Sequence, residues 1–509
     1  MKKYMCNSLF IALFYAFTSV FLMSCDEIFD KNPVKNPSTM APDVSFTALT
    51  DDNKIAWFNA QSLKNPSKTL SISGLPSGEQ VISIDYRPAT GQLYGLGMSS
   101  RLYIINEQSG VATSLGENSF SLGIMGDNAS IDFNPIVDRV RLVTQSGQNL
   151  RLHPELGTVV AEDGSINGGN QPLIGAVAYT NSMAGATSTK LYDIDFSSNK
   201  LYLQIPPNDG GLEEVGDLGE DFMGMGNLDI SPDNKNAFAV TLNEGISKLY
   251  TINLNNGNAD WLGDFSIPVL GIAFKTDPVA YATSIDDYLF RFNPMNPGDD
   301  KVALTGLMDG EHIIGLDFRA MNGSLFGISN QSRLYTVNTS NGALTQVGSQ
   351  LDPMFHSAQS VGFDFNPTVD RIRLVTSSGE NFRLHPDLGT VVAIDGDLKP
   401  GDPMVNGAAY TNNIPNASTT ELFVLDSKVN KLFKQDPPND GVLVEIGDLG
   451  TSIFEGNGFD IGGDSGIAYA LIKADGAYGI YTINLNTAKI TKTADFNFDV
   501  VSMSVGLGF

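Results

Sequence analysis

The sequence predicts an all-β fold in which a four-stranded antiparallel unit recurs along most of the chain. Three observations support this prediction. The chain contains two long copies of one sequence, each copy contains a shorter repeat, and the shorter repeat has the pattern of strands joined by tight turns. A hydrophobic content of 42% with 52 Gly and 24 Pro is typical of a turn-rich β protein and not of a disordered chain.

The long repeat places two nearly identical segments 232 residues apart. Ile131–Gly164 and Phe363–Gly396 are identical at 26 of 34 positions. The correspondence extends outward, since the PPNDG segment that begins at Pro206 matches the PPNDG segment that begins at Pro437. A period this long often contains a shorter one, and the shorter period decides the fold.

The short repeat is clearest between Val81 and Gly116, where the runs ISIDY, QLYGLG, RLYIIN and VATSLG are separated by turn residues. Such alternating runs between Gly, Pro, Asn and Ser indicate hairpin-linked strands. The same four-part unit recurs from Ile314, and in weaker form from Asn227 and Phe459. The first strands of successive units begin near Ser83, Ser130, Gly175, Asn227, Gly271, Gly315, Gly362, Gly407, Gly458 and Gly506.

These units of roughly 46 residues predict a β-propeller, whose four-stranded blades pack face to face around an axis and leave few exposed strand edges. The ends of the chain support this prediction. The final segment Val505–Phe509 matches the first strand Leu270–Phe274, whereas Ser45–Thr50 has the pattern of a second strand without its first. The C-terminal strand is therefore expected to complete the first blade.

The spacer between the two copies bears on the number of rings. Only Lys275–Pro278 separates the strand Gly271–Phe274 from the strand Val279–Ser284, which is the length of an ordinary turn within a blade. We therefore predict one ten-bladed ring in which these two strands pair. Two five-bladed propellers are the alternative, in which Gly271–Phe274 pairs with Phe46–Thr50. The C-terminal Val505–Phe509 would then pair with Val279–Ser284.

The first residues have the pattern of an export signal. Two lysines precede an apolar run from Leu9 to Met23, which is shorter than the about 20 residues of a membrane span. The run ends in LMSC, which resembles the lipobox of bacterial lipoproteins and predicts lipidation of Cys25; an ordinary signal peptide is the alternative. Because Cys6 lies within the signal, Cys25 would be the lone thiol of an exported protein unless it were acylated.

The sequence thus divides into a lipoprotein signal peptide (1–24), a lipidated Cys with a flexible stalk (25–44), and two propeller halves (45–274 and 275–509). The acidic segment Asp26–Asp30 resembles the surface-export tag of Bacteroidetes lipoproteins, with a solvated tether as the alternative. We expect an outer-membrane lipoprotein of the cell envelope, exposed at the surface if this tag operates, whose membrane partner is reached through acyl chains on Cys25.

The formal net charge of −26 argues against a nucleic-acid partner, because binding to phosphates requires clustered Lys and Arg. No zinc-ligand spacing is present around the four His residues, and the patterns of a nucleophile elbow or a phosphate-binding loop are absent from the sequence. We therefore predict no metal and no cofactor.

An Asp recurs in the first strand of six predicted blades, at positions 85, 132, 229, 317, 364 and 460. Two carboxylates in a propeller channel could act as the acid and base of a glycosidase. However, a residue that recurs at one position in six blades is expected to perform the same structural task each time. We expect these carboxylates to bind turn amides or an Arg of the next strand.

The third blade of each half contains a group of cationic and amide side chains. A hairpin that turns around Ser146 places Arg141 opposite Arg151 and Arg139 opposite His153, all on one face. The candidate ligand-binding residues are Arg139, Arg141, Asn149, Arg151 and His153, with Arg371, Arg373, Asn381, Arg383 and His385 in the second copy. They fit either an inter-blade network with Asp132 and Asp138, or a site for an anion or an acidic sugar. A single ring would place the two groups on opposite sides.

Three segments together resemble a known family. They are DFNPxVDRxRLVTxSGxNxRLHPxLG, the preceding IDYRPATGQLYGLG, and the following AYTN…LYDID…PPNDGxL. They resemble the bacterial domain of unknown function 4394 family, over nearly all of Phe46 to Phe509 in two copies. The resemblance implies exported bacterial proteins with a propeller-like repeat, and it supplies no catalytic residue.

These observations favour a lipid-anchored propeller that binds a glycan or a surface protein at the cell envelope. The fourth blade of each half has a long polar loop, at Thr180–Lys190 and Thr411–Glu421, whose Asn, Ser and Thr could donate to a glycan. The alternatives are a glycoside hydrolase or lyase that uses channel carboxylates and arginines, and a structural envelope protein. Repetition of the candidate residues favours binding over catalysis.

Overall fold

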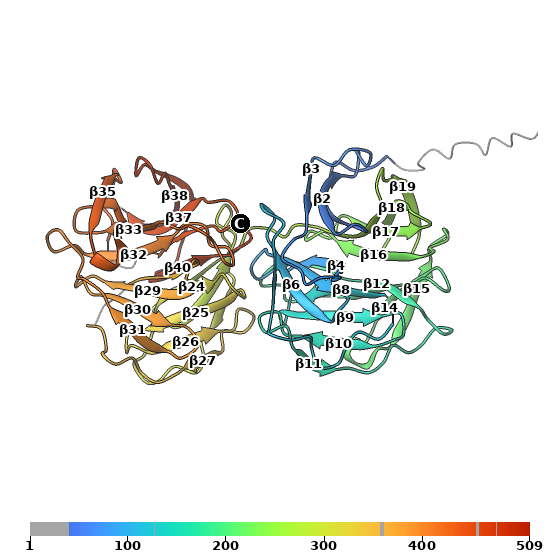
Figure 1. The fold of residues 1–509 in the computed structure, drawn as a ribbon, viewed down its shortest axis with the longest axis horizontal. Coiled ribbons are helices and arrows are strands. Elements are labelled where there is room, and N and C mark those ends of the chain that lie inside the picture. The colour runs from blue at the N-terminus through green and yellow to red at the C-terminus, as the bar shows by residue number, and fades with distance from the viewer. Residues whose placement is uncertain (1–39, 127, 357–360, 455–457, 475) are drawn as a thin grey trace, which may run out of the picture. The chain divides into compact units, whose positions relative to one another are not determined.

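The fold was analysed in a computed structural model, which describes residues 40–509 except 127, 357–360, 455–457 and 475. Cys25 and the rest of the predicted signal and lipidation segment lie outside the described residues. Almost all regular structure is β-strand (Figure 1). Within the described part of the chain, no helix has the length and apolar character needed to cross a membrane.

Residues 45–273 form five four-stranded antiparallel sheets. From the innermost strand outward, the first three are β20 (Val269–Ala273), β1 (Ser45–Thr50), β2 (Lys54–Asn59), β3 (Lys68–Ser71); β4 (Val81–Tyr86), β5 (Leu93–Gly97), β6 (Arg101–Ile105), β7 (Ala112–Ser114); and β8 (Ala129–Asn134), β9 (Arg139–Thr144), β10 (Asn149–Leu152), β11 (Val159–Glu162). The other two are β12 (Ile174–Tyr179), β13 (Leu191–Asp195), β14 (Lys200–Gln204), β15 (Leu212–Asp217); and β16 (Met225–Ile230), β17 (Ala237–Asn243), β18 (Ile246–Ile252), β19 (Ala259–Asp264).

Residues 280–505 form five further sheets of the same kind. The first three are β40 (Ser502–Val505), β21 (Ala280–Thr283), β22 (Tyr288–Phe292), β23 (Lys301–Ala303); β24 (Ile313–Arg319), β25 (Ser324–Ser329), β26 (Leu334–Val337), β27 (Leu344–Val347); and β28 (Val361–Asn366), β29 (Arg371–Thr376), β30 (Asn381–His385), β31 (Thr390–Ile394). The other two are β32 (Val405–Tyr410), β33 (Leu422–Asp426), β34 (Lys431–Gln435), β35 (Leu443–Asp448); and β36 (Gly458–Ile461), β37 (Ala468–Ala474), β38 (Ala477–Ile483), β39 (Ile490–Asp495). The PPNDG segments form short 3₁₀ turns, η1 (Pro207–Asp209) and η2 (Pro438–Asp440).

The innermost strands of each set contact one another in a closed circle. In the first set the order around the circle is β20, β4, β8, β12, β16 and back to β20. In the second set it is β40, β24, β28, β32, β36 and back to β40. The strands therefore form two five-bladed propellers, and each set surrounds its own axis (Figure 1).

The prediction of a single ten-bladed ring is wrong, and the alternative of two propellers is confirmed. The closing strand of the second propeller is Ser502–Val505, however, so only Val505 of the predicted strand Val505–Phe509 belongs to it. Strand β20 pairs with β1, with Gly271 opposite Leu49, and strand β40 pairs with β21, with Val505 opposite Ala280. Each propeller is thus closed by the last strand of its own copy. The short segment 274–279 leaves the innermost strand of one propeller and enters the second strand of the next. Its length is compatible with both connections, which is why spacer length misled the prediction.

Burial falls from the axis of each propeller to its rim. All six residues of β12 are buried, because neighbouring blades cover both faces of an innermost strand. The outer strand β31 alternates exposed and half-buried residues. The cores lie between adjacent blades, as where Phe46 of the closing blade packs against Phe238 of the neighbouring blade, with ring centroids 5.9 Å apart. This edge-to-face contact joins the closing blade to its neighbour and reinforces the ring.

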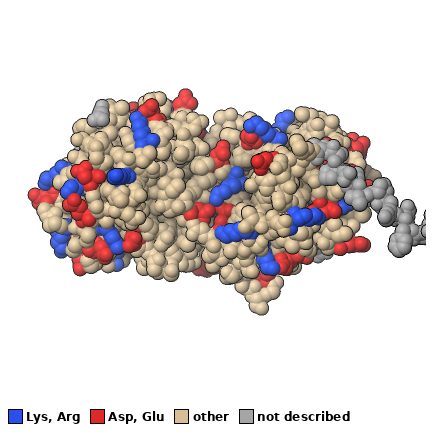
Figure 2. Space-filling model, turned by 90° about the horizontal axis from the view of Figure 1, so that it is seen from above, with Lys and Arg blue, Asp and Glu red and all other residues tan. Residues whose placement is uncertain are grey.

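Charged side chains are mixed on the surface. On the face shown in Figure 2, acidic and basic side chains lie beside one another over both propellers. Several form exposed ion pairs of the kind seen between Lys200 and Glu214 (2.6 Å) and between Lys431 and Glu445 (2.7 Å). Such exposed pairs contribute little to stability.

Candidate functional sites

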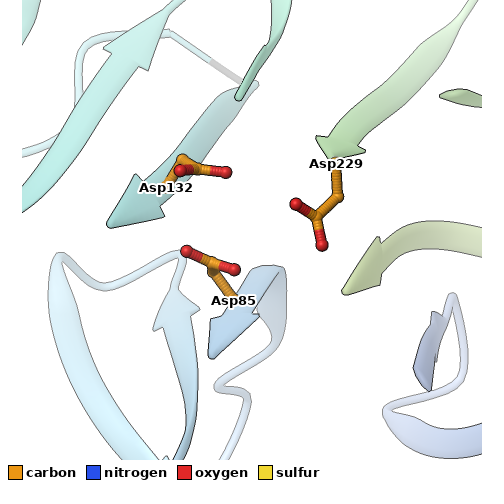
Figure 3. Close-up of side chains that lie close together, drawn as sticks. All are labelled: Asp85, Asp132 and Asp229. Atoms are coloured by element: carbon orange, nitrogen blue, oxygen red, sulfur yellow. The ribbon is translucent and has the colours of Figure 1, made fainter. Parts of the chain in front are cut away.

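Three recurring Asp residues meet at the axis of each propeller. In the first propeller they are Asp85, Asp132 and Asp229, which point toward one another from β4, β8 and β16 (Figure 3). The second propeller repeats the arrangement with Asp317, Asp364 and Asp460. In each group, called here a carboxylate triad, one oxygen of every residue lies within 4.8 Å of the others, and all three residues are buried.

Each triad carboxylate accepts a hydrogen bond from a backbone N–H in the innermost strand of the next blade or, for Phe274, directly after it. In the first propeller the pairs are Asp85 Oδ2 with Phe133 N (2.7 Å), Asp132 Oδ1 with Tyr179 N (3.0 Å) and Asp229 Oδ2 with Phe274 N (2.5 Å). In the second they are Asp317 Oδ2 with Phe365 N (2.7 Å), Asp364 Oδ1 with Tyr410 N (3.0 Å) and Asp460 Oδ2 with Val505 N (2.6 Å). The partners are strand amides, rather than the turn amides or Arg side chains that we expected.

The triads hold their protons more tightly than ordinary carboxyl groups do. Burial, followed by repulsion from the neighbouring carboxylates, raises the pKa of Asp85, Asp132 and Asp364 well above the usual range. Burial also raises the pKa of Asp229 to about 7 and that of Asp460 to about 6, although backbone N–H donors oppose the shift.

This geometry does not suit glycoside hydrolysis. The carboxyl groups of a retaining glycosidase lie roughly 5–5.5 Å apart across the substrate, and those of an inverting enzyme lie farther apart. Here the carboxyl groups are buried beside one another and are bonded to backbone amides inside a closed ring, so a glycosidic bond cannot lie between them without opening the ring. Carboxylate oxygens are ligands that Ca²⁺ accepts. In each triad, however, every carboxyl group also accepts a hydrogen bond from a backbone N–H of the next blade.

The arginine group of the first propeller forms a closed network. Arg141 pairs with Arg151 across β9 and β10, as predicted. The Arg141 side chain is only 2% exposed, and its donors reach Asp163 Oδ2 (2.6 Å), Asn149 Oδ1 (2.7 Å), Asn208 Oδ1 (2.8 Å) and the Tyr179 hydroxyl (3.3 Å). Arg151 forms a bidentate pair with Asp163 at 2.7 Å and 2.8 Å.

The second propeller repeats this network. Arg373 donates to Asp395 Oδ2, Asn381 Oδ1 and Asn439 Oδ1, each at 2.7 Å, and Arg383 pairs with Asp395 at 2.8 Å and 2.9 Å. The anionic partners are thus Asp163 and Asp395, instead of Asp132 and Asp138 as the sequence suggested. Although burial alone would raise the pKa of Asp163, Arg151 and Arg141 lower it.

Sequence reasoning missed the partners supplied by the PPNDG turns. Asn208 and Asn439 belong to η1 and η2, and the buried Asn149 and Asn381 donate to the carbonyls of Pro207 and Pro438 at 3.0 Å. The turns therefore bind the arginine network of the preceding blade. The sequence did contain a sign of this contact, because the PPNDG turns and the arginines recur together in both copies.

The other predicted members lie at the edge of the network. Arg139 and Arg371 donate to the backbone carbonyls of Asp138 (2.7 Å) and Asp370 (2.8 Å). His153 Nδ1 and His385 Nδ1 accept backbone N–H groups of Glu155 (3.3 Å) and Asp387 (3.2 Å). Burial lowers the pKa of His153, which keeps its imidazole neutral near pH 7. Ligand binding by the arginine, asparagine and histidine residues of the two networks stays a prediction. The hydrogen bonds described above already use the main donor groups of the arginines.

Two open pockets lie elsewhere in the compact unit formed by Thr39–Phe509. One, of about 520 Å³, is lined by Trp57 of β2 together with amide, hydroxyl and charged side chains. The other, of about 570 Å³, is lined by the predicted polar loop Thr411–Glu421. Gln108 and Asp464 line both pockets, so the two adjoin.

The strand order and the axial triads define the chain as a tandem pair of five-bladed β-propellers. The family described as Domain of unknown function (DUF4394) matches residues 54–273 and 288–504. The chain belongs to this family and contains two tandem copies of its domain, which confirms the resemblance predicted from the sequence.

No curated protein matches the chain. Three of the solved structures similar to it have a TM-score of 0.26 each. They are the extracellular domain of the one component system BT4673 from B. thetaiotaomicron (9% identity, 89% of this chain, 65% of that chain), the Dos1 propeller (11%, 67%, 92%), and PorZ, a bacterial surface component of the type-IX secretion system of Porphyromonas gingivalis (14%, 89%, 60%). The chain thus spans less than two thirds of the first and third structures. These likenesses are distant, and nothing about activity follows from them.

Proposed function

We propose that the protein is a lipid-anchored binding module of the bacterial cell envelope, whose propellers hold a glycan or a surface protein. One observation carries this proposal. The carboxylates and arginines that an enzyme could use are consumed by bonds between and within blades at matching positions in both copies, whereas the open pockets are lined by polar loops.

A hydrolase or lyase finds less support in this structure. A general acid or base must come within hydrogen-bond distance of the reacting group. Asp132 and Asp364 are each 1% exposed and are bonded to the adjacent blade, so a bound sugar would not reach them without opening the ring. Binding in surface pockets requires no such opening.

A glycan array with the purified protein, run beside an assay for new reducing ends, tests this function. We expect binding of at least one glycan, or of an isolated surface protein, without cleavage of the glycan. New reducing ends or unsaturated sugar products would establish the hydrolase or lyase alternative. Failure to bind any glycan or surface protein would favour the structural alternative.

The location is part of the same proposal. We propose that residues 1–24 direct export and that acyl chains on Cys25 hold the protein in the membrane. Each buried CH₂ contributes about 0.8 kcal/mol, so two or three chains give stable anchoring. Cys25→Ala should remove metabolic acyl labelling and leave the signal uncut at this site. Normal acyl labelling of the variant would contradict the anchor.

A further inference from the structure

We infer that the pocket lined by Trp57 binds a neutral oligosaccharide, with a sugar ring in contact with the exposed part of the indole. This inference rests on the proposed binding function and names the ligand class and the site. Trp57 is half-buried, since it packs against the apolar cluster between the first two blades and also lines the pocket. The exposed part of an aromatic ring held in this way offers apolar surface beside polar groups, which suits the C–H groups of a sugar.

The polar wall of the pocket is held in place by buried contacts. Glu107 is buried, and it accepts hydrogen bonds from the Tyr86 hydroxyl (2.5 Å) and from Lys275 Nζ (2.9 Å). Lys68 Nζ donates to the Glu107 carbonyl (2.8 Å) and lies 4.7 Å from the centre of the Trp57 ring. These contacts fix the charged groups around the indole before any ligand arrives.

The charges of the lining balance. Lys68 and Lys275 face Glu107 and Asp464, and Lys275 pairs with both acids at 2.9 Å and 3.2 Å. Burial lowers the pKa of Lys275, but the two carboxylates outweigh this effect and raise it, so the amine stays charged. A lining without net charge, in a protein of net charge −26, gives an anionic ligand no electrostatic advantage.

The rest of the lining consists mainly of side chains that both donate and accept hydrogen bonds. These are Ser45, Asn59, Ser62, Asn65, Ser67 and Gln108. Amides and hydroxyls match the paired donor and acceptor character of sugar hydroxyls. Phe58, the other aromatic residue of the lining, is only 2% exposed, so Trp57 is the aromatic residue that a ligand can contact. A neutral polyhydroxyl ligand therefore fits best.

The two propellers differ in sequence at the position of Trp57. In the first propeller Trp57 lies opposite Thr47, and in the second Arg291 lies opposite Tyr281 at the matching register. Arg291 forms a bidentate pair with Asp300 at 2.7 Å and 3.0 Å and donates to the Ser340 carbonyl (2.9 Å). The pocket lined by Arg291 measures only about 10 Å³. The first copy thus has an open aromatic pocket where the second has a filled one.

The adjoining pocket extends this surface. It shares Gln108 and Asp464 with the Trp57 pocket and adds Asn412, Thr420 and Glu421 from the polar loop. The two adjoining pockets, of about 520 Å³ and 570 Å³, each have the size of a small-molecule site, so a chain of sugars can occupy both. We therefore assign an oligosaccharide rather than a monosaccharide.

Fluorescence tests this inference directly, because the sequence contains only 2 Trp residues. Trp261 lies outside the pocket on β19, so Trp261→Phe leaves Trp57 as the single indole and serves as the control variant. Titration of this variant with neutral oligosaccharides, among them those that bind on the glycan array, should change the Trp57 emission. The double substitution Trp57→Arg with Lys68→Asp copies Arg291 and its partner Asp300 and should weaken binding by at least about tenfold.

The outcomes separate the inference from the proposed function. Unchanged glycan affinity in the double variant, or no effect of any neutral oligosaccharide on Trp57 emission, overturns the inference. Binding of a glycan elsewhere, or of a surface protein, would still leave the binding function standing. If the double variant does not fold, Asn65→Ala replaces it, since Asn65 is an exposed lining residue, and it should weaken binding several-fold. Unchanged affinity in that variant would equally overturn the site.

Discussion

At the scale of single residues, Asp193 marks a clear break in the duplication. It lies in the segment LYDID of β13, whereas the matching segment LFVLD of β33 has Val424 at this position. Asp193 is fully buried, and among the described residues neither of its carboxyl oxygens has a hydrogen-bond partner. Burial raises its pKa well above the usual range, although the charge of Arg141 opposes this. A buried polar group without a partner costs stability.

Asp193→Val should therefore stabilise the first propeller by about 1–3 kcal/mol near neutral pH. The raised pKa means that the unfolded state loses the proton first. The free energy of unfolding of the wild-type protein therefore decreases as pH rises from about 4 toward the pKa that Asp193 has in the folded state. Urea unfolding at pH 5 and pH 8 should show a stability gain that is larger at pH 8. Val424→Asp is the matched control and should destabilise, while a loss of stability in Asp193→Val would contradict this account.

At the scale of elements, the innermost strands are held to one another by bonds from carboxyl groups to backbone amides. Each triad member contacts the next blade, so the bonds follow the ring. In the second propeller Ser504 of the closing strand also donates to Asp317 (3.0 Å) and Asp460 (2.9 Å). The triads therefore support both the ring and its closure, and their protonation should affect the stability of both propellers.

The triads predict that stability falls as pH rises from acidic to neutral values. Because the folded-state pKa values are raised, the contribution is fully present below about pH 4 and is lost as pH rises through about 6 for Asp460 and about 7 for Asp229. The melting temperature should fall between pH 5 and pH 8. Asp229→Asn keeps an acceptor for the Phe274 N–H but cannot ionise, so it should reduce this fall. If the melting temperature of Asp229→Asn falls with pH as much as that of the wild type, ionisation of Asp229 is not the cause of the fall.

The arginine network holds the third blade of each propeller to the PPNDG turn of the next blade. Arg141→Ala would leave Asn149 and Asn208 without their donor, and Asp163 would retain only Arg151. We expect a loss of about 3 kcal/mol, measured by denaturant unfolding.

Arg139→Ala is the control for this network, because Arg139 donates only to backbone carbonyls of its own turn, and it should cost much less. If Arg141→Ala leaves stability unchanged but abolishes binding to an acidic glycan, the network is a ligand site and the structural interpretation is wrong.

At the scale of the whole molecule, closure of each ring depends on one strand from the end of its own copy. Strand β40 fills the innermost position beside β21, and its Val505 N–H binds Asp460 of the preceding blade. Strand β20 does the same beside β1 through Phe274 and Asp229. Because only β40 ends the chain, the two closures can be tested separately.

Deletion of residues 500–509 should remove β40, expose the edge of β21 and remove the bond to Asp460. An unpaired strand edge promotes association with other chains, so we expect dimers or aggregates by light scattering. A synthetic peptide of residues 500–509 should restore the monomer by adding the missing strand. A truncated protein that stays monomeric with an unchanged melting temperature would show that this strand is not needed for closure.

The sequence by itself determined the blade repeat, the strands and the family, because turn residues and alternating apolar residues are local signals. It also predicted the pairing of Arg141 with Arg151, since a hairpin fixes the register of neighbouring strands. Only the tertiary structure decided which innermost strand closes which ring. Strands β20 and β40 offer the same backbone pattern to β1 and β21, so either pairing satisfies the sequence. The partners Asp163 and Asn208 and the pocket at Trp57 likewise depend on distant segments that meet only when the blades pack.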